Sequence, residues 1–131
     1  MNEELQKIIK TSTFDVQNGK YVYVRAKSAP SLGDHFLITQ DADEITVVTR
    51  EENLYQLDVV EKNKDFYALI ALNVSMPFYS VGFLATVSDA IVKQGMNILI
   101  VSTYSKDYIL VREDFKDKTE AVLLELGFVK K

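Results

Sequence analysis

The sequence predicts an α+β fold, because strand-like and helix-like segments alternate over the second half of the chain. Residues 66–74 (FYALIALNV) are almost continuously apolar and rich in strand-forming residues, as in the central strand of a sheet. From Val81 the apolar residues recur at helical spacing, and Gly95 is placed to end that helix. Residues 96–101 and 108–111 are strand-like again, and the short polar connection between them predicts a hairpin.

The C-terminal end completes the pattern with a second helix and a last strand. Glu113 and Asp114 suit the positive end of a helix, and Gly127 is placed to end it. Residues 128–129 then form a short strand. A strand-helix-strand-strand-helix-strand order in about 65 residues is the ferredoxin-like βαββαβ plan, an antiparallel sheet with two helices on one face.

The first half of the chain is less regular. Asn18-Gly19 is a turn signal, and a short helix, one strand and a strand pair are expected over residues 4–10, 21–26, 36–40 and 45–49. Residues 58–65 are polar enough to form the seam between the halves. We therefore expect one domain over residues 1–62 and a second over residues 63–131.

Composition excludes several classes of function. The chain has no cysteine, which rules out disulfides, thiolate metal sites and a cysteine nucleophile. Its N-terminus lacks the features of a signal peptide and no segment is apolar enough to span a membrane, so we expect a cytoplasmic protein without a membrane partner. The net charge is −4 and the 15 Lys and Arg are scattered, which argues against a nucleic-acid partner.

The sequence contains little that indicates a catalytic, metal or cofactor site. His35 is the only histidine, so neither a histidine pair for a metal nor a histidine relay can form. No serine lies in a G-x-S-x-G elbow, and the surroundings of Gly82 contain no phosphate-binding loop. The acidic residues 41–44 are expected to form a solvated hairpin tip. We therefore expect no catalytic residue, no metal and no cofactor.

One turn is suited to a small molecule. Gly82 begins a helix after the central strand, with Ser80 as a reasonable N-cap, and the unsatisfied N–H groups there favour a carboxylate. We expect Asn97 and Ile98 beside that turn, and Asp107 to meet a cationic group. The alternative is that Gly82 only permits helix packing and that Asp107 only caps a hairpin; spacing alone favours neither.

Residues 81–85, 95–98 and 102–111 resemble ACT domains, including the regulatory domains of aspartate kinases. They look closer still to small bacterial tandem-ACT proteins of uncharacterised function and to cytosolic arginine sensors. The resemblance implies that the first half is a degenerate ACT-like subdomain. It also implies that an amino acid sits between neighbouring ACT units.

The turn and the resemblance together predict eight ligand-binding residues: Ser80, Val81, Gly82, Asn97, Ile98, Thr103, Tyr104 and Asp107. The expected function is that of a non-catalytic regulatory module that binds a small molecule, first of all an amino acid. A homo-oligomer, first of all a dimer, is expected because the plan leaves strand edges free for pairing. The alternative function is a structural or protein-interaction module that drives dimerisation with no ligand.

Overall fold

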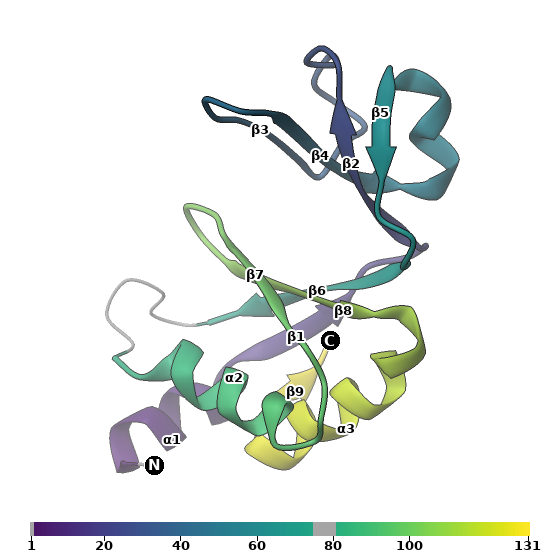
Figure 1. Cartoon of the computed structure of the whole chain (residues 1–131). Coiled ribbons are helices and arrows are strands. Elements are labelled where there is room, and N and C mark those ends of the chain that lie inside the picture. Colours follow the sequence, from purple (N-terminus) through teal and green to yellow (C-terminus); the bar gives the residue numbers. More distant parts are fainter. Residues whose placement is uncertain (1, 75–80) are drawn as a thin grey trace. The chain divides into compact units, whose positions relative to one another are not determined.

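The computed structural model describes residues 2–74 and 81–131, and the chain divides into two compact units (Figure 1). The first unit contains Met1–Gln17 together with Ala68–Lys131, and the second contains Asn18–Tyr67. We call them the helical unit and the sheet unit. Each is described by itself.

The helical unit contains the predicted βαββαβ arrangement. Its elements are α1 (Glu3–Lys10), β1 (Thr13–Val16), β6 (Tyr67–Asn73), α2 (Phe83–Val92), β7 (Leu99–Ser102), β8 (Asp107–Arg112), η2 (Glu113–Phe115), α3 (Lys116–Leu126) and β9 (Val129–Lys130). The strands lie in the order β7-β8-β6-β1-β9. The ferredoxin-like fold is therefore confirmed for this half of the chain.

Strand β1 was not predicted, and it changes the extent of this unit. It pairs antiparallel with β6 through Phe14 and Leu72, and parallel with β9 through Thr13 and Val129. It thus lies between the first and fourth strands of the βαββαβ plan. As a result the first seventeen residues pack with residues 68–131, whereas the sequence had placed them in a domain ending at residue 62.

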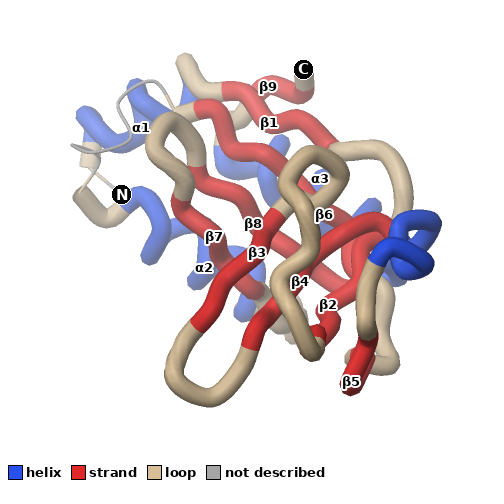
Figure 2. Tube along the Cα trace, turned by 90° about the horizontal axis from the view of Figure 1, so that it is seen from above, coloured by secondary structure: helices blue, strands red, loops and turns tan. Residues whose placement is uncertain are grey.

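Three helices cover one face of the sheet of the helical unit, and the core lies between them and the strands (Figures 1 and 2). Helix α1 contributes Leu5 and Ile9, which come four residues apart and so lie on one face of the helix. Helix α2 contributes the buried residues Phe83, Val87 and Ile91 at the same spacing. Each side chain of this size stabilises the fold by about 1.5 to 3 kcal/mol when buried.

The sheet unit repeats the strand order with fewer helices. It contains β2 (Tyr21–Ala26), β3 (Leu37–Gln40), β4 (Ile45–Arg50), η1 (Glu51–Gln56) and β5 (Val59–Lys62). The strands lie in the order β3-β4-β2-β5 and all pair antiparallel. Residues 27–36 and the 3-10 helix η1 take the places that helices occupy in the βαββαβ plan, so this unit has a degenerate form of the same fold.

Residues 58–65, which were expected to be a polar connection between two domains, contain a strand. Val59–Lys62 forms β5, which pairs with β2 through Arg25 and Glu61, and all four of its residues are exposed. A strand exposed on both faces needs no alternation of apolar and polar residues. Its composition therefore resembles that of a loop, which is why the sequence did not reveal it.

Candidate functional site

The turn that begins helix α2 differs from the prediction in its cap: the sequence suggested Ser80 as the N-cap and a helix from Val81, whereas the helix begins at Phe83. Gly82 is the N-cap, with φ of 81° and ψ of 0° in the left-handed region, and its carbonyl accepts from the N–H of Thr86. A Cβ added at Gly82 would meet only Leu5 of α1, at 3.8 Å, so backbone conformation rather than crowding calls for glycine here. The preceding Val81 is 89% exposed. Ser80 lies outside the described residues.

The hairpin between β7 and β8 brings two polar side chains together. Ser102 and Asp107 face each other across the strands, and the Ser102 hydroxyl donates to Oδ1 of Asp107 at 2.6 Å. Asp107 is only 7% exposed. A hydrogen bond to a buried carboxylate is stronger than one between neutral groups. This pair therefore holds an acidic group in a fixed position beside the turn of the hairpin.

The turn itself is closed by Thr103. Its backbone N–H and its hydroxyl both donate to the carbonyl of Lys106, at 2.8 and 3.0 Å. Tyr104 is exposed at the tip of the hairpin. The predicted residues Thr103, Tyr104 and Asp107 thus belong to one short segment whose backbone is fixed by hydrogen bonds.

Asn97 and Ile98 lie beyond the C-terminal end of helix α2, on the other side of the helix from the Gly82 turn along the chain. They follow helix α2, whereas Gly82 precedes it, and a helix of ten residues is about 15 Å long. The expectation that the start of β7 lies beside the Gly82 turn is therefore not met within one chain. A ligand that touches both Gly82 and Asn97 requires the second residue to come from another copy of the chain.

Two open hollows are lined by residues that were not predicted to bind a ligand. One, of about 660 Å³, lies against helices α2 and α3 and is lined by Ala85, Thr86, Asp89, Ala90, Lys93 and Leu126. The other, of about 330 Å³, lies on the sheet unit and is lined by Tyr23, Val24, Arg25, Glu44, Thr46, Glu61, Lys62 and Asn63. The small residues on the outer face of α2 were the available signal for the first.

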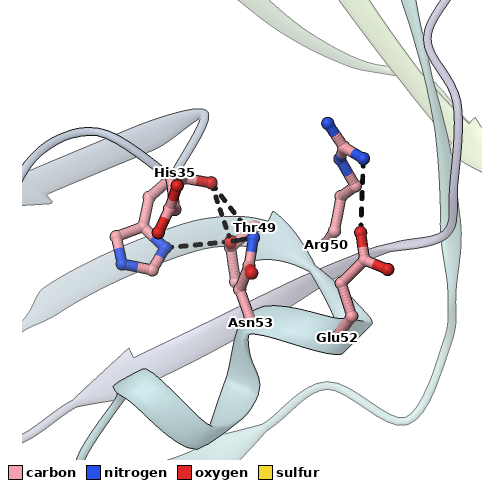
Figure 3. Close-up of polar contacts among 6 residues, drawn as sticks. His35, Thr49, Arg50, Glu52 and Asn53 are labelled. Atoms are coloured by element: carbon pink, nitrogen blue, oxygen red, sulfur yellow. Dashed lines mark hydrogen bonds and ion pairs between the residues drawn. The ribbon is translucent and has the colours of Figure 1, made fainter.

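His35 lies in a group of side-chain contacts that connect a loop to its neighbouring elements (Figure 3). Its Nδ1 lies 2.9 Å from the hydroxyl of the buried Thr49, and the side-chain amide of Asn53 donates to the carbonyl of Asp34 at 3.2 Å. These contacts fasten the loop before β3 to the end of β4 and to η1. Among residues 2–74 and 81–131, no group of three His, Asp or Glu side chains is placed to hold a metal ion.

Tyr23 and Lys130 have raised pKa values. Burial, followed by the neighbouring Tyr67, raises the pKa of Tyr23 above its ordinary value, and the two rings meet edge to face with centroids 5.5 Å apart. A hydrogen bond of 2.6 Å to Glu120 raises the pKa of Lys130. Neither group lies in the predicted ligand-binding segments.

The fold and the βαββαβ order define an ACT-like α+β protein. Residues 62–125 match the ACT domain family. This confirms the resemblance that the Gly82 turn and the β7–β8 hairpin suggested. No curated protein matches the sequence.

Solved structures share the fold over nearly the whole chain. A protein of unknown function from Vibrio cholerae, described as a possible transport protein, has a TM-score of 0.78 at 20% identity, covering 95% of this chain and 97% of its own. A protein from Agobacterium tumefaciens has a TM-score of 0.74 at 24% identity, covering 92% of both chains.

The regulatory subunit of aspartate kinase from Thermus thermophilus has a TM-score of 0.61 at 8% identity, covering 88% of this chain and 95% of its own. At these identities the likeness establishes the fold. In the described part of the chain, no helix combines the length and apolar character needed to cross a membrane.

Proposed function

We propose that this chain is a non-catalytic, cytosolic regulatory module that binds a small molecule, first of all an amino acid, at the Val81–Gly82 turn. The observation that carries the proposal is the left-handed Gly82 at the start of α2, inside the segment that matches the ACT domain family. Without a Cβ at this position, a ligand can approach the backbone closely. The first N–H groups of a helix have no partner within the helix and favour an anion such as the carboxylate of an amino acid.

The β7–β8 hairpin supplies the group that would meet the cationic end of the ligand. Asp107 is an acidic residue held in place by Ser102, and a charge-assisted hydrogen bond from an ammonium group would contribute about 1.5 to 3 kcal/mol if shielded from water. Thr103 and Tyr104 lie next to it in the same turn. Asn97 and Ile98 would come from a second copy of the chain, and Ser80 would precede the turn.

The first test is a thermal-unfolding screen of the twenty amino acids. A ligand at about 100 times its dissociation constant should stabilise the folded chain by about 2.7 kcal/mol. Gly82→Leu should abolish this response, because the side chain forces the turn out of its conformation and blocks the approach to the helix N-terminus. If no amino acid raises the melting temperature at millimolar concentration, the ligand proposal is wrong.

Gly33→Leu is a matched control for that variant. Gly33 also has a positive φ, 128°, and a Cβ there would have nothing within 4 Å. A side chain in the left-handed region costs roughly 1 to 2 kcal/mol in either place. Gly33→Leu should therefore lower the melting temperature without removing the ligand response, which separates loss of the site from loss of stability.

A second candidate function is homodimerisation without a ligand. The hollow against α2 and α3 favours it, because it is lined largely by small and apolar residues on the surface of the helical unit. In that case the chain should form a dimer and no amino acid should change its stability. Both functions are open to a protein that matches the ACT domain family, and the two measurements are independent.

A further inference from the structure

We propose that Asn18 is a modification site, at which the side-chain amide is converted to a carboxylate without the help of an enzyme. The nucleophile is the backbone nitrogen of Gly19, and the products are aspartate and isoaspartate at position 18. Asn18 and Gly19 lie in the turn between β1 and β2, and neither belongs to the proposed ligand site. The proposal therefore depends on neither a bound ligand nor a second copy of the chain.

The conversion uses water and releases ammonia. The nitrogen of Gly19 loses its proton to hydroxide and attacks Cγ of Asn18, which closes a succinimide ring. The C–N bond of the side-chain amide breaks, and ammonia leaves with a proton taken from water. Water then opens the ring: breaking the bond to Cγ gives aspartate, and breaking the bond to the main-chain carbonyl gives isoaspartate. Because both groups belong to adjacent residues, the attack is intramolecular and has a high effective concentration.

The residue that follows an asparagine decides how easily the backbone nitrogen reaches Cγ. Gly19 has no Cβ, so no side chain shields its nitrogen from Asn18. The other five asparagines precede residues that carry side chains: Glu3, Leu54, Lys64, Val74 and Ile98. Asn18 is therefore the asparagine with the least hindered attack.

Both reacting groups of this pair are accessible. Asn18 and Gly19 are exposed, so water and hydroxide reach them. Within residues 2–74 and 81–131, neither the Asn18 side chain nor the N–H of Gly19 has a hydrogen-bond partner. The attack at this position therefore breaks no hydrogen bond of the folded chain.

The backbone of the turn leaves room for the attack. Asn-Gly favours a tight hairpin turn of type I′, which requires a positive φ at both residues. Gly19 has a φ of 95°, whereas in the described part of the chain only glycines have a positive φ, so Asn18 does not. The turn is thus not of type I′. Without a hydrogen bond at Gly19, rotation about Asn18 can bring the nitrogen to Cγ.

The other asparagines provide a comparison within the same chain. Hydrogen bonds of 2.7 to 3.2 Å hold the side chains of Asn2, Asn53, Asn63 and Asn73. Asn97 is exposed and, among the residues that the structure describes, has no side-chain partner, which makes it the match for Asn18. It differs in being followed by the β-branched Ile98. The difference in rate between the two positions therefore measures the contribution of Gly19 and its open turn.

The products add a negative charge where the chain enters the sheet unit. Asn18 is the first residue of that unit, and a Cβ added at the adjacent Gly19 would lie 3.0 Å from Cδ of Arg50. Arg50 forms an exposed ion pair with Glu52 at 3.2 Å. A carboxylate at position 18 is next to this arginine and can attract its guanidinium. Isoaspartate also lengthens the main chain by one methylene just before β2.

Peptide mapping by mass spectrometry, on the full folded chain incubated at neutral and at mildly alkaline pH, tests the proposal. Exchange of an amide NH₂ for OH should accumulate at Asn18 at least about tenfold faster than at Asn97, a difference of about 1.4 kcal/mol in activation free energy. The rate should rise with hydroxide concentration. In ¹⁸O-labelled water the label should enter position 18, and ion exchange should separate a species with one more negative charge.

Two variants and one reference state identify the reaction. Asn18→Gln should show no conversion over the same period, because its longer side chain would have to close a larger and slower-forming ring. Asn18→Asp is identical to one product, so the converted material that differs from it is isoaspartate. The chain unfolded in urea gives the rate without the fold.

Three results would overturn the proposal. If Asn18 converts in urea but persists in the folded chain, the folded turn blocks the attack. If Asn18 and Asn97 convert at the same rate, Gly19 and its turn have no influence. If Asn18 is stable even in urea, the pair is not reactive. The thermal response of Asn18→Gln to amino acids should equal that of the wild type, so these results leave the ligand proposal untouched.

Discussion

In the helical unit three helices cover one face of the sheet, whereas in the sheet unit residues 27–36 and the 3-10 helix η1 stand where the helices would be. Both units place their first strand beside the third and their second strand at an edge. The helical unit also inserts β1 between its first and fourth strands. The comparison teaches that the same strand order occurs with and without the covering α-helices, and that the helix N-terminus proposed to bind a ligand belongs to the helical unit.

The largest effect should come from the strand that the helical unit has in addition. Phe14 of β1 is fully buried in the core of that unit. Phe14→Ala should lower the free energy of unfolding by about 3 to 5 kcal/mol, because it removes a ring and leaves a cavity. Urea denaturation measures it, with the exposed Leu32→Ala as the control that should change little. A loss below about 1 kcal/mol would mean that β1 is not part of the core.

The hairpin pair should give the next largest effect. Ser102→Ala, Asp107→Ala and the double variant form a cycle around the 2.6 Å hydrogen bond. A bond to a charged acceptor contributes about 1.5 to 3 kcal/mol, so the two single losses should exceed the loss in the double variant by an amount in that range. If the losses in unfolding free energy were additive, the two side chains would not interact. The hydrogen bond to Ser102 would then not hold Asp107 in a fixed position.

The sheet unit should respond to alkaline pH through Tyr23. Its pKa is raised in the folded chain by burial and by Tyr67. A raised folded pKa means that the stabilising effect is fully present below the unfolded value of about 10 and is lost as pH rises through the folded value. The free energy of unfolding should therefore fall more steeply above pH 10 in the wild type than in Tyr23→Phe. Equal slopes in urea titrations at several pH values would contradict this.

The smallest effect should come from strand β5. All four of its residues are exposed, whereas most residues of the core strand β6 in the helical unit are buried. Glu61 pairs with Arg25 at 3.5 Å, and both side chains are exposed. Exposed ion pairs contribute about 0 to 1 kcal/mol, so Glu61→Gln should change the free energy of unfolding by less than about 0.5 kcal/mol. A larger loss would mean that β5 is held by its side chains rather than by its backbone pairing with β2.

The parts of the fold that the sequence predicted are those with a strong periodic signal. Residues 66–74 and the segment from Val81 carry long apolar patterns, so β6 and α2 were expected nearly where they lie. Strands β1 (TFDV) and β5 (VVEK) include charged residues among only four positions, so neither shows the apolar run by which the equally short β7 was predicted. β1 is also paired with strands distant along the chain, a contact that no local pattern records.

The sequence predicted the separate segments of the candidate site, but it did not predict how those segments lie relative to one another. The place of Gly82 at the start of a helix followed from its position after an apolar strand, and the hairpin followed from two strands joined by a short polar segment. The separation of Asn97 from Gly82 depends on the length and direction of α2. The hollow against α2 and α3 depends on how these two helices pack, so the small residues on the outer face of α2 became meaningful only beside Leu126.

The central claim is that an amino acid binds at the start of α2, and amide chemical shifts test it most directly. On titration of the ¹⁵N-labelled chain with the amino acid that gives the largest thermal shift, the backbone amides of residues 82–85 and 107 should move together and saturate. The same titration of Gly33→Leu should reproduce this, and that of Gly82→Leu should not. Saturable shifts confined to other residues, or no shifts at all, would contradict the claim.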